Sequence, residues 1–204
     1  MIRIYVPFMD RLNLNGDGAN ALIIQKRLKW AGFGSQIIGL SDEVDFAKAL
    51  KSSKTEALFV IVGHGSRAAM DSISSFKAEL VDLIDLANTT GGGGLVIGSS
   101  YEWLVPHDKG RRKSEFVIEK IDIPGLEIEV DAVGYVNSDS NLEDLLWSQN
   151  VLYTRLHGPI LAKSPELADH FCGLLTSGKY IPKTPAGLDH IVAEAQAIAR
   201  GERD

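Results

Sequence analysis

Three short turns in the sequence carry residue types that acyl-transfer chemistry uses. They are Gly63-His64-Gly65-Ser66, Gly98-Ser99-Ser100-Tyr101 and His157-Gly158-Pro159, and each follows an apolar, strand-like run. In acyl transfer a nucleophile on a strand-to-helix turn works beside a histidine base, and backbone N–H groups of a glycine-rich turn stabilise the oxyanion. Ligands of open α/β sheets bind beyond the carboxyl ends of the strands. We therefore expect the three turns to meet there.

Each of these residues also has a plain structural interpretation. Glycine after a strand usually serves a tight turn. Ser99 and Ser100 are candidate nucleophiles, but neither has Gly-x-Ser-x-Gly flanks, and small residues are common in turns. His157 is either a general base or a hydrogen-bonded histidine at a strand end. His64 lies in the turn itself, where its side chain would block or reshape a pocket.

Alternating strand-like and helix-period segments should position these turns. Such alternation is typical of a mostly parallel sheet covered on both faces. Glycine at 32, just past a helical segment, marks a helix end, and Ser164 before Pro165 marks a helix start. The predicted strands are residues 2–6, 36–40, 56–62, 95–97 and 151–156, and the predicted helices are about 19–31, 45–51, 73–87, a segment from 164, and 186–200.

The second half of the chain has a different pattern. Residues 115–123 and 126–135 each alternate in polarity, and Pro124-Gly125 between them predicts an antiparallel hairpin. Residues 141–148 are expected to cover a sheet edge. The four glycines at 91–94 precede a strand, which is the wrong order for a phosphate-binding loop, so we predict a flexible connection there.

Composition excludes several classes of function. The 204 residues fit one domain over 1–204, and the net charge of −6 comes with interspersed signs, so neither nucleic acid nor an anionic membrane is an expected partner. No apolar run is long enough for a membrane span, and the start of the chain resembles a strand, so the cytoplasm is expected. Cys172 is the only cysteine and lies on an apolar helical face, which predicts a core position. The histidines lack metal-ligand spacing, so no metal and no cofactor is expected.

Two signatures resemble class I glutamine amidotransferases of the CobB/CobQ type, and within them the GatD-type glutaminases. Residues 11–20 (RLNLNGDGAN) and 27–32 (RLKWAG) are similar to "MNLYGD-x-GN" and "R-x-x-W-R-G" of that family. Residues 153–169 are similar to its "TYLHGPLLPKNPELAD". A fainter likeness links residues 134–137, ending in Asn137, to "GFEN". The resemblance implies a three-layer, flavodoxin-like α/β fold with an antiparallel hairpin extension.

The resemblance also assigns roles to the three turns. It implies that Gly63, His64, Gly65 and Ser66 form the oxyanion turn and that His157 stands at the position of the base, while Tyr101 and Asn137 belong to the glutamine or small-molecule pocket. The family nucleophile is the cysteine of "CGGYQLLG". Tyr101 fixes the register, which puts Gly98 at that cysteine and Glu102 at the glutamine. Glycine cannot form a thioester, so the nucleophile position is vacant.

Two functions remain open on these residues. By resemblance, the chain is a GatD-like subunit without glutaminase activity that binds or regulates a Mur-ligase-like (MurT-like) partner in cell-wall precursor amidation or a related pathway. The alternative is an active amidotransferase or an amide or ester hydrolase that uses an elbow serine with His157. The segment between Leu104 and Val151 is also shorter than in the family that the chain resembles. A glycine introduced artificially at 98 would leave this difference and Glu102 unexplained.

Overall fold

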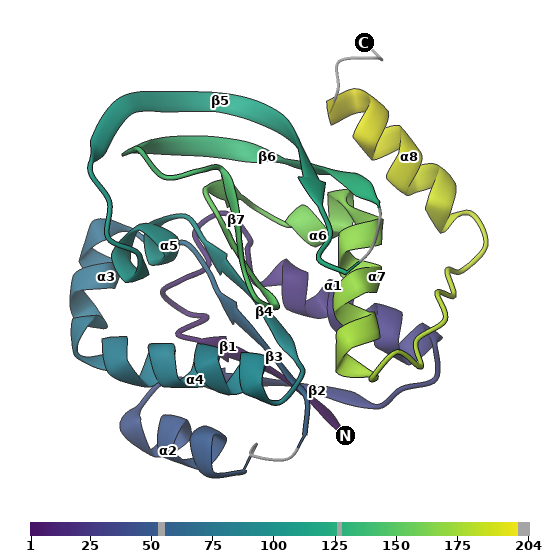
Figure 1. Ribbon diagram of the computed structural model, residues 1–204, viewed down its shortest axis with the longest axis horizontal. Helices are drawn as coiled ribbons and strands as arrows, with labels where there is room; N and C mark the ends of the chain where they lie inside the picture. The colour runs from purple at the N-terminus through teal and green to yellow at the C-terminus, as the bar shows by residue number, and fades with distance from the viewer. Residues whose placement is uncertain (53–55, 126–127, 200–204) are drawn as a thin grey trace.

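The computed structural model describes residues 1–52, 56–125 and 128–199, and its central element is a six-stranded sheet of order β2-β1-β3-β4-β8-β7. Five of these strands run parallel, and β7 pairs antiparallel with β8 at one edge. Figure 1 shows the sheet between two helical layers. The strands are β1 (Ile2–Pro7), β2 (Ser35–Leu40), β3 (Leu58–Val62), β4 (Gly93–Ile97), β7 (Leu145–Ser148) and β8 (Val151–Thr154).

Side chains of the central strands alternate between two cores. In β3, which is wholly buried, Phe59 and Ile61 face one core while Leu58, Val60 and Val62 face the other. This is the two-residue period of a strand covered on both faces. The prediction of a mostly parallel, three-layer flavodoxin-like α/β fold is therefore confirmed.

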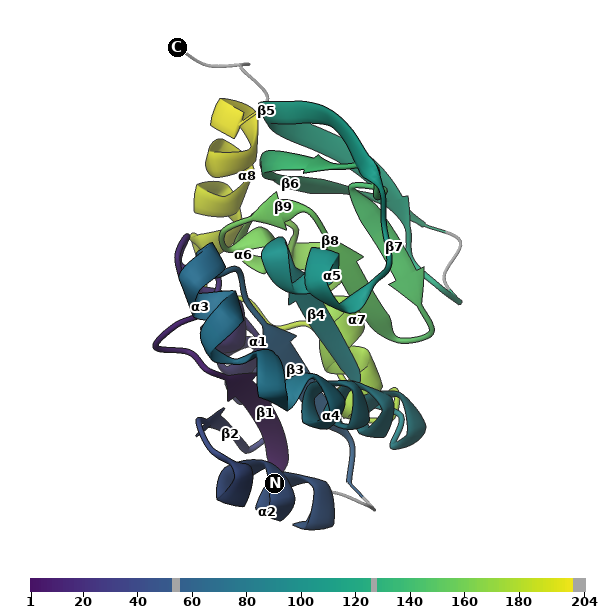
Figure 2. The ribbon, with the colours of Figure 1, turned by 90° about the vertical axis from the view of Figure 1, so that its left-hand side faces the viewer.

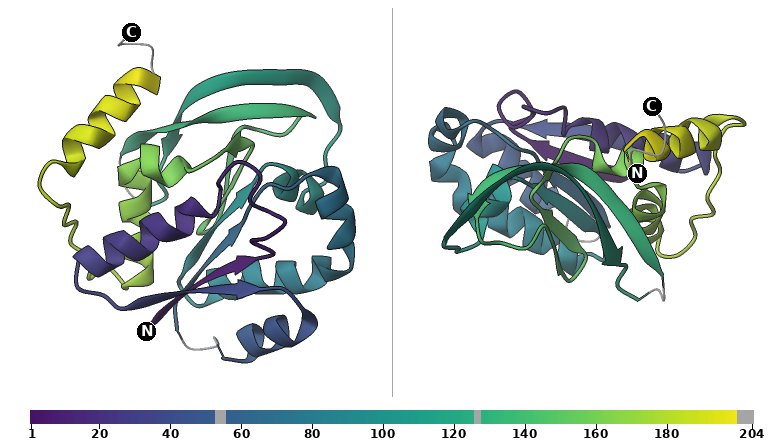
Figure 3. Two further views of the ribbon diagram at one scale, coloured as in Figure 1. Left: turned by 180° about the vertical axis from the view of Figure 1, so that it is seen from behind. Right: turned by 90° about the horizontal axis from the view of Figure 1, so that it is seen from above.

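Helices from different parts of the chain cover the two faces. The first core is closed by α1 (Ala19–Trp30), α6 (Ile160–Lys163) and α7 (Pro165–Leu175). The second core is closed by α2, α3, α4 and α5, and the view from behind in Figure 3 separates the two layers. The remaining helical bounds are α2 (Glu43–Ser52), α3 (Arg67–Ser72), η1 (Ser74–Phe76), α4 (Lys77–Thr89), α5 (Ser99–Leu104) and α8 (Leu188–Ala199).

A second sheet of three antiparallel strands, in the order β5-β6-β9, extends the fold. The long hairpin of β5 (Lys109–Asp122) and β6 (Glu129–Ser140) arches over one end of the molecule (Figures 1 and 2). The short strand β9 (Leu156–His157) pairs with β6, and Tyr135 lies opposite His157. The predicted hairpin is confirmed and is longer than expected. The predicted strand start at Leu126 and the predicted helix end at Arg200 lie outside the described residues.

Four local predictions are wrong. Gly92, Gly93 and Gly94 are buried and packed, since a Cβ at Gly92 would lie 1.9 Å from the Leu58 carbonyl oxygen, and only Gly91 is open, so residues 91–94 are not a flexible connection. α7 begins at Pro165 as predicted, but Ser164 does not cap it with its side chain as a serine at this position suggests; its hydroxyl donates to the Asp131 carbonyl oxygen at 2.8 Å. The single helix predicted at residues 73–87 is instead η1 followed by α4, and α3 precedes it as a separate helix. The single strand predicted at 151–156 is two strands in different sheets, separated at Arg155.

Candidate functional site

The turn after β4 has the backbone of a sharp strand-to-helix elbow. Gly98 has φ +55° and ψ −120°, a conformation that side chains strain to adopt. Its N–H donates to the Thr154 carbonyl oxygen at 2.7 Å, and its own carbonyl accepts from the N–H of Glu102 at 3.0 Å. These bonds fix the elbow between β8 and the start of α5. The elbow geometry is therefore present without a nucleophilic side chain.

The two serines of the elbow hold the neighbouring Gly63–Ser66 turn. The Ser99 hydroxyl donates to the Gly65 carbonyl oxygen and accepts from the Gly65 N–H, both at 3.0 Å. The buried Ser100 hydroxyl donates to the Gly63 carbonyl oxygen at 2.7 Å. Both hydroxyls are directed at backbone groups of the turn, so neither makes the hydrogen bond to His157 that a nucleophile–base pair requires.

His64 extends its imidazole into the elbow. The N–H of Ser99 donates to the Nδ1 atom of His64 at 3.0 Å. Because Nδ1 accepts this bond, the imidazole is neutral with its proton on Nε2. Burial lowers the pKa of His64, and the nearby charge of Glu102 partly opposes that change. The backbone N–H of Ser99 is thus bound by the His64 side chain and is not free to bind a ligand.

His157 lies directly against His64. The two ring centroids are 4.2 Å apart and the rings meet edge to face. His157 is 7% exposed, and its buried Nδ1 atom has no hydrogen-bond partner among the described residues. Burial, followed by the proximity of His64, lowers the pKa of His157 to about 4. At neutral pH both imidazoles are therefore uncharged.

The two histidines fill the volume that a side chain at position 98 would need. A Cβ on Gly98 would lie 2.5 Å from Cε1 of His157 and 2.6 Å from Nδ1 of His64. Real Cβ contacts of this length essentially do not occur, so any larger residue requires both rings to move. The glycine, His64 and His157 form one packed unit.

Asp17 and Asn20, which their residue types and spacing did not mark as site residues, tie the turns together. The buried Asp17 carboxylate accepts from the N–H of His64 at 2.8 Å and from the N–H of Gly158 at 2.7 Å. Asn20 donates to the Gly158 carbonyl oxygen at 3.2 Å and accepts from the N–H of Leu161 at 2.9 Å. Burial raises the pKa of Asp17, while its two backbone hydrogen bonds oppose this. The signal was the segment Asn15-Gly16-Asp17-Gly18-Ala19-Asn20 itself.

An ion pair joins the two sequence signatures. Arg27 on α1 contacts Asp169 on α7 at 2.5 Å, and the Tyr180 hydroxyl donates to the same carboxylate oxygen at 2.6 Å. Arg27 is almost fully buried. This pair explains why arginine and aspartate recur in segments 142 residues apart. Cys172, on the same helix as Asp169, is fully buried, as predicted.

The remaining predicted residues lie away from the two histidine rings. Tyr101 is fully buried in the second core, 5.5 Å from the Tyr153 ring, and burial raises its pKa to about 12. Ser66 is exposed and caps α3 by accepting from the N–H of Ala69 at 3.2 Å. Asn137 is on the exposed face of β6 and accepts from Arg112 at 2.7 Å. The structure therefore does not bring Tyr101, Ser66 and Asn137 into one cavity.

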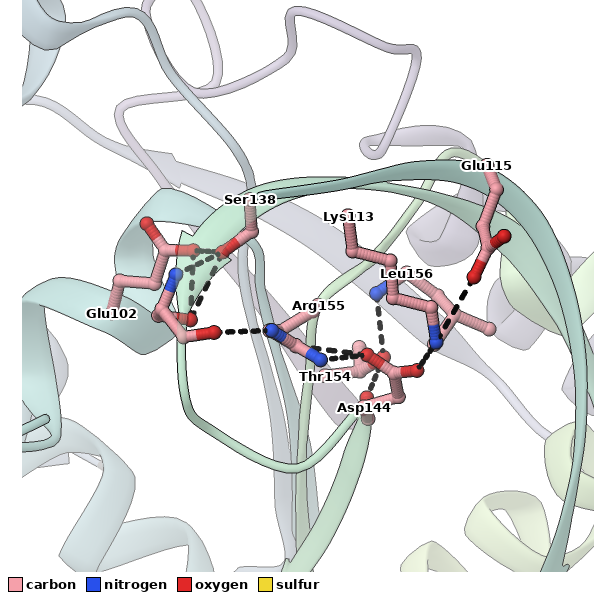
Figure 4. Close-up of polar contacts among 9 residues, drawn as sticks. Glu102, Lys113, Glu115, Ser138, Asp144, Thr154, Arg155 and Leu156 are labelled. Carbon is pink, nitrogen blue, oxygen red and sulfur yellow. Dashed lines mark hydrogen bonds and ion pairs between the residues drawn. The ribbon is translucent and has the colours of Figure 1, made fainter. Parts of the chain in front are cut away.

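Glu102 belongs to a polar network beneath the hairpin, shown in Figure 4. Its carboxylate accepts hydrogen bonds from the hydroxyls of Ser138 and Ser140 on β6. Arg155 donates to the Ser140 carbonyl oxygen at 2.7 Å and pairs with Asp144 at 2.5 Å. Glu102 thereby fastens the elbow helix to the hairpin.

Arg155 also marks where the chain leaves the central sheet. Its backbone N–H donates to the Asp144 carbonyl oxygen at 3.0 Å, and the Thr154 hydroxyl donates to the same oxygen at 2.9 Å. The N–H of Leu156 then donates to the Thr154 hydroxyl. Lys113 of β5 pairs with the Oδ2 atom of the Asp144 carboxylate. These contacts turn the chain toward β9, so that His157 comes to face the elbow.

Two further findings concern ligands and membranes. Within residues 1–52, 56–125 and 128–199, no three His, Cys, Asp or Glu side chains gather as metal ligands would. No helix in the described part of the chain has the length and apolar character that a bilayer crossing requires.

The fold and the elbow together define an α/β protein of the three-layer, flavodoxin-like class with an antiparallel hairpin extension. No protein-family model matches the chain. The chain is similar to the GatD subunit of lipid II isoglutaminyl synthase (glutamine-hydrolyzing) from Staphylococcus aureus (strain N315). The two are 23% identical over 234 residues, which covers 96% of this chain and 93% of the relative. This similarity supports a relationship to GatD across nearly the whole chain.

Proposed function

We propose that the chain is a GatD-like subunit of the amidotransferase family that does not hydrolyse glutamine and that binds or regulates a Mur-ligase-like (MurT-like) enzyme. The process would be cell-wall precursor amidation or a related pathway in the cytoplasm. The relative from S. aureus is by name a subunit of a glutamine-hydrolyzing enzyme, so a role within a larger assembly is the natural expectation for this chain.

The observation that carries the proposal is the packing at the elbow. Glutamine hydrolysis through a thioester needs a nucleophile, a base and free oxyanion donors. Here Gly98 offers no nucleophile, and the N–H of Ser99 is bound to His64. His64 and His157 also occupy the space of the missing side chain. Two of the three requirements, the nucleophile and a free oxyanion donor, are therefore affected, which a change at one residue alone would not do.

The hydrogen bonds of the serines argue against the alternative hydrolase. A serine nucleophile must direct its hydroxyl at the base. Ser99 and Ser100 direct theirs at Gly65 and Gly63 instead. If either hydroxyl turned toward His157, the backbone of the Gly63–Ser66 turn would lose a hydrogen bond that holds it to α5.

The test measures glutamate released from glutamine by the purified chain, alone and with a purified MurT-like ligase. We expect no release above the blank in either sample, while S. aureus GatD with its own partner serves as the positive control. Activity that disappears in a Ser99→Ala/Ser100→Ala double variant would overturn the proposal in favour of the serine hydrolase.

The partner is tested separately, by size-exclusion chromatography of the chain mixed with the MurT-like ligase. Co-elution at one-to-one stoichiometry is the expected result. Elution as two separate species would remove the Mur-ligase part of the proposal and leave the prediction of glutaminase inactivity intact.

A further inference from the structure

A groove runs along α7, at the amino ends of the strands, whereas Gly98 lies at their carboxyl ends. Its volume is about 830 Å³, within the range of small-molecule sites. The lining includes Gly91 and Asn150, which stand just before β4 and β8, whereas Gly98 follows β4. The groove is therefore separate from the histidine pair, and binding there is independent of the proposed function.

Three parts of the fold line this groove. α7 contributes His170, Gly173 and Leu174 from successive turns of one face. Ile128, beside the hairpin end, and Tyr180, beyond α7, form other parts of the wall. Ile128 is 46% exposed, so apolar surface is available to an incoming molecule.

Gly173 forms an open floor. A Cβ built on it would have no heavy atom within 4 Å outside its own helix. From Glu166 to Leu174 the helix advances about 12 Å, at 1.5 Å per residue. The site therefore has the length of an extended chain of about ten carbon atoms, and a large side chain at 173 would fill it without displacing its neighbours.

The charged side chains that line the groove are acidic, so they favour a positively charged ligand. Glu166 and Asp169 are the charged residues among the described lining, which contains no lysine or arginine. Asp169 is already paired with Arg27 and bound by Tyr180. Glu166 is exposed near one end of the groove. His170 packs against the rings of Trp147 and Phe171, and burial lowers its pKa, so it adds no positive charge at neutral pH.

We propose that the groove along α7 binds an elongated apolar molecule that carries an amine, with the apolar chain over Gly173 and the ammonium group beside Glu166. Burial of the chain provides affinity and the carboxylate provides the preference for a cation.

The test compares decylamine with decanoate, which have the same chain length and opposite charges, by isothermal titration calorimetry below their micelle concentrations. We expect saturable, one-to-one binding of decylamine to the full chain, and binding of decanoate that is weaker by about fivefold or more. Absence of decylamine binding, or equal affinity for both molecules, would overturn the proposal.

Two variants locate the binding. Gly173→Trp should weaken decylamine binding at least about tenfold, because the indole fills the floor. Gly39→Trp is the matched control, since Gly39 lies on the edge strand β2 with equally open surroundings, and it should bind as the unmodified chain does. Unchanged binding to Gly173→Trp would show that the amine binds elsewhere and would refute the site.

Glu166→Gln provides an independent test that does not depend on the folding of Gly173→Trp. It should remove the preference for decylamine over decanoate while keeping the affinity for the uncharged analogue decanol. Retention of the full preference in this variant would overturn the assignment of the ammonium group to Glu166.

Discussion

The backbone N–H of Ser99 donates to the Nδ1 atom of His64 at 3.0 Å, across the gap between the turns that follow β4 and β3. This N–H follows Gly98, which we propose stands at a vacant nucleophile position. In acyl-transfer sites with a nucleophile elbow, the equivalent N–H is an oxyanion donor. The absence of a side chain at 98 and the presence of an imidazole at 64 are therefore structurally coupled.

This coupling predicts that Gly98→Cys alone destabilises the protein. The positive φ costs about 1–3 kcal/mol for a non-glycine residue, and the contacts with His64 and His157 add to it. Gly32→Cys is the matched control, because Gly32 also has a positive φ but an open Cβ position. Urea unfolding should show a larger loss for Gly98→Cys than for Gly32→Cys. Equal losses would show that the rings do not obstruct the side chain.

The same coupling predicts that removing the imidazole makes room for a thiol. In a His64→Ala/Gly98→Cys double variant, part of the lost stability should return, and the introduced thiol should react with iodoacetamide. The native cysteine, Cys172, is an internal control, since burial raises its pKa to about 12 and it should stay unmodified. An introduced thiol that reacts equally fast in the single and double variants would contradict the role given to His64.

The histidine pair predicts a loss of stability in mild acid. His157 has a pKa of about 4 in the folded protein and about 6.5 when unfolded, so between these values the unfolded state binds more protons. Stability is complete above pH 6.5 and falls as the pH approaches 4, by roughly 3 kcal/mol. Urea titrations across this range measure it. His157→Gln should reduce the fall, while His107→Gln, at an exposed position, should not; an unchanged slope in His157→Gln would refute the assignment.

The sequence was sufficient for the layered fold because apolar runs such as residues 58–62 record burial on both faces of a strand. It was not sufficient at Arg155, where the chain changes sheets. That change depends on Asp144, which is brought close only by the folded edge strand. The prediction of a flexible connection at residues 91–94 failed for a similar reason, since the contact of Gly92 with Leu58 is absent from any local pattern.

In the candidate site, too, some features could be predicted from the sequence and others only from the folded structure. Resemblance indicated Gly98 and His157, because short signatures fix their positions along the chain. The bond between His64 and Ser99 depends on the orientation of a side chain across two strands, which spacing does not encode. The carboxylate of Asp17, bound to two turns at once, was likewise hidden within a loop signature.

Asp17 is predicted to hold the turns in place. Asp17→Asn keeps the shape but has one acceptor oxygen, so the N–H of His64 or that of Gly158 loses its partner. A buried, unsatisfied N–H costs about 1–3 kcal/mol. Chemical unfolding should show this loss, and hydrogen exchange at the amides of His64 and Gly158 should accelerate. Asp10→Asn, an exposed change in the same loop, is the control; equal exchange in both variants would refute the role of Asp17.

Arg155 is predicted to be the strongest single link between the two sheets. Arg155→Met removes the more deeply buried of the two cationic partners of Asp144 and the donor to the Ser140 carbonyl oxygen. Breaking a buried pair from one side costs up to about 3–5 kcal/mol when the remaining charge has no other partner. We expect a smaller loss here, because the partly exposed Lys113 still pairs with Asp144. Lys113→Met is the matched comparison: its side chain is 29% exposed, and Asp144 keeps Arg155. Urea unfolding should therefore rank Arg155→Met well below Lys113→Met in stability. The reverse order would mean that Lys113, and not Arg155, neutralises Asp144 beneath the hairpin.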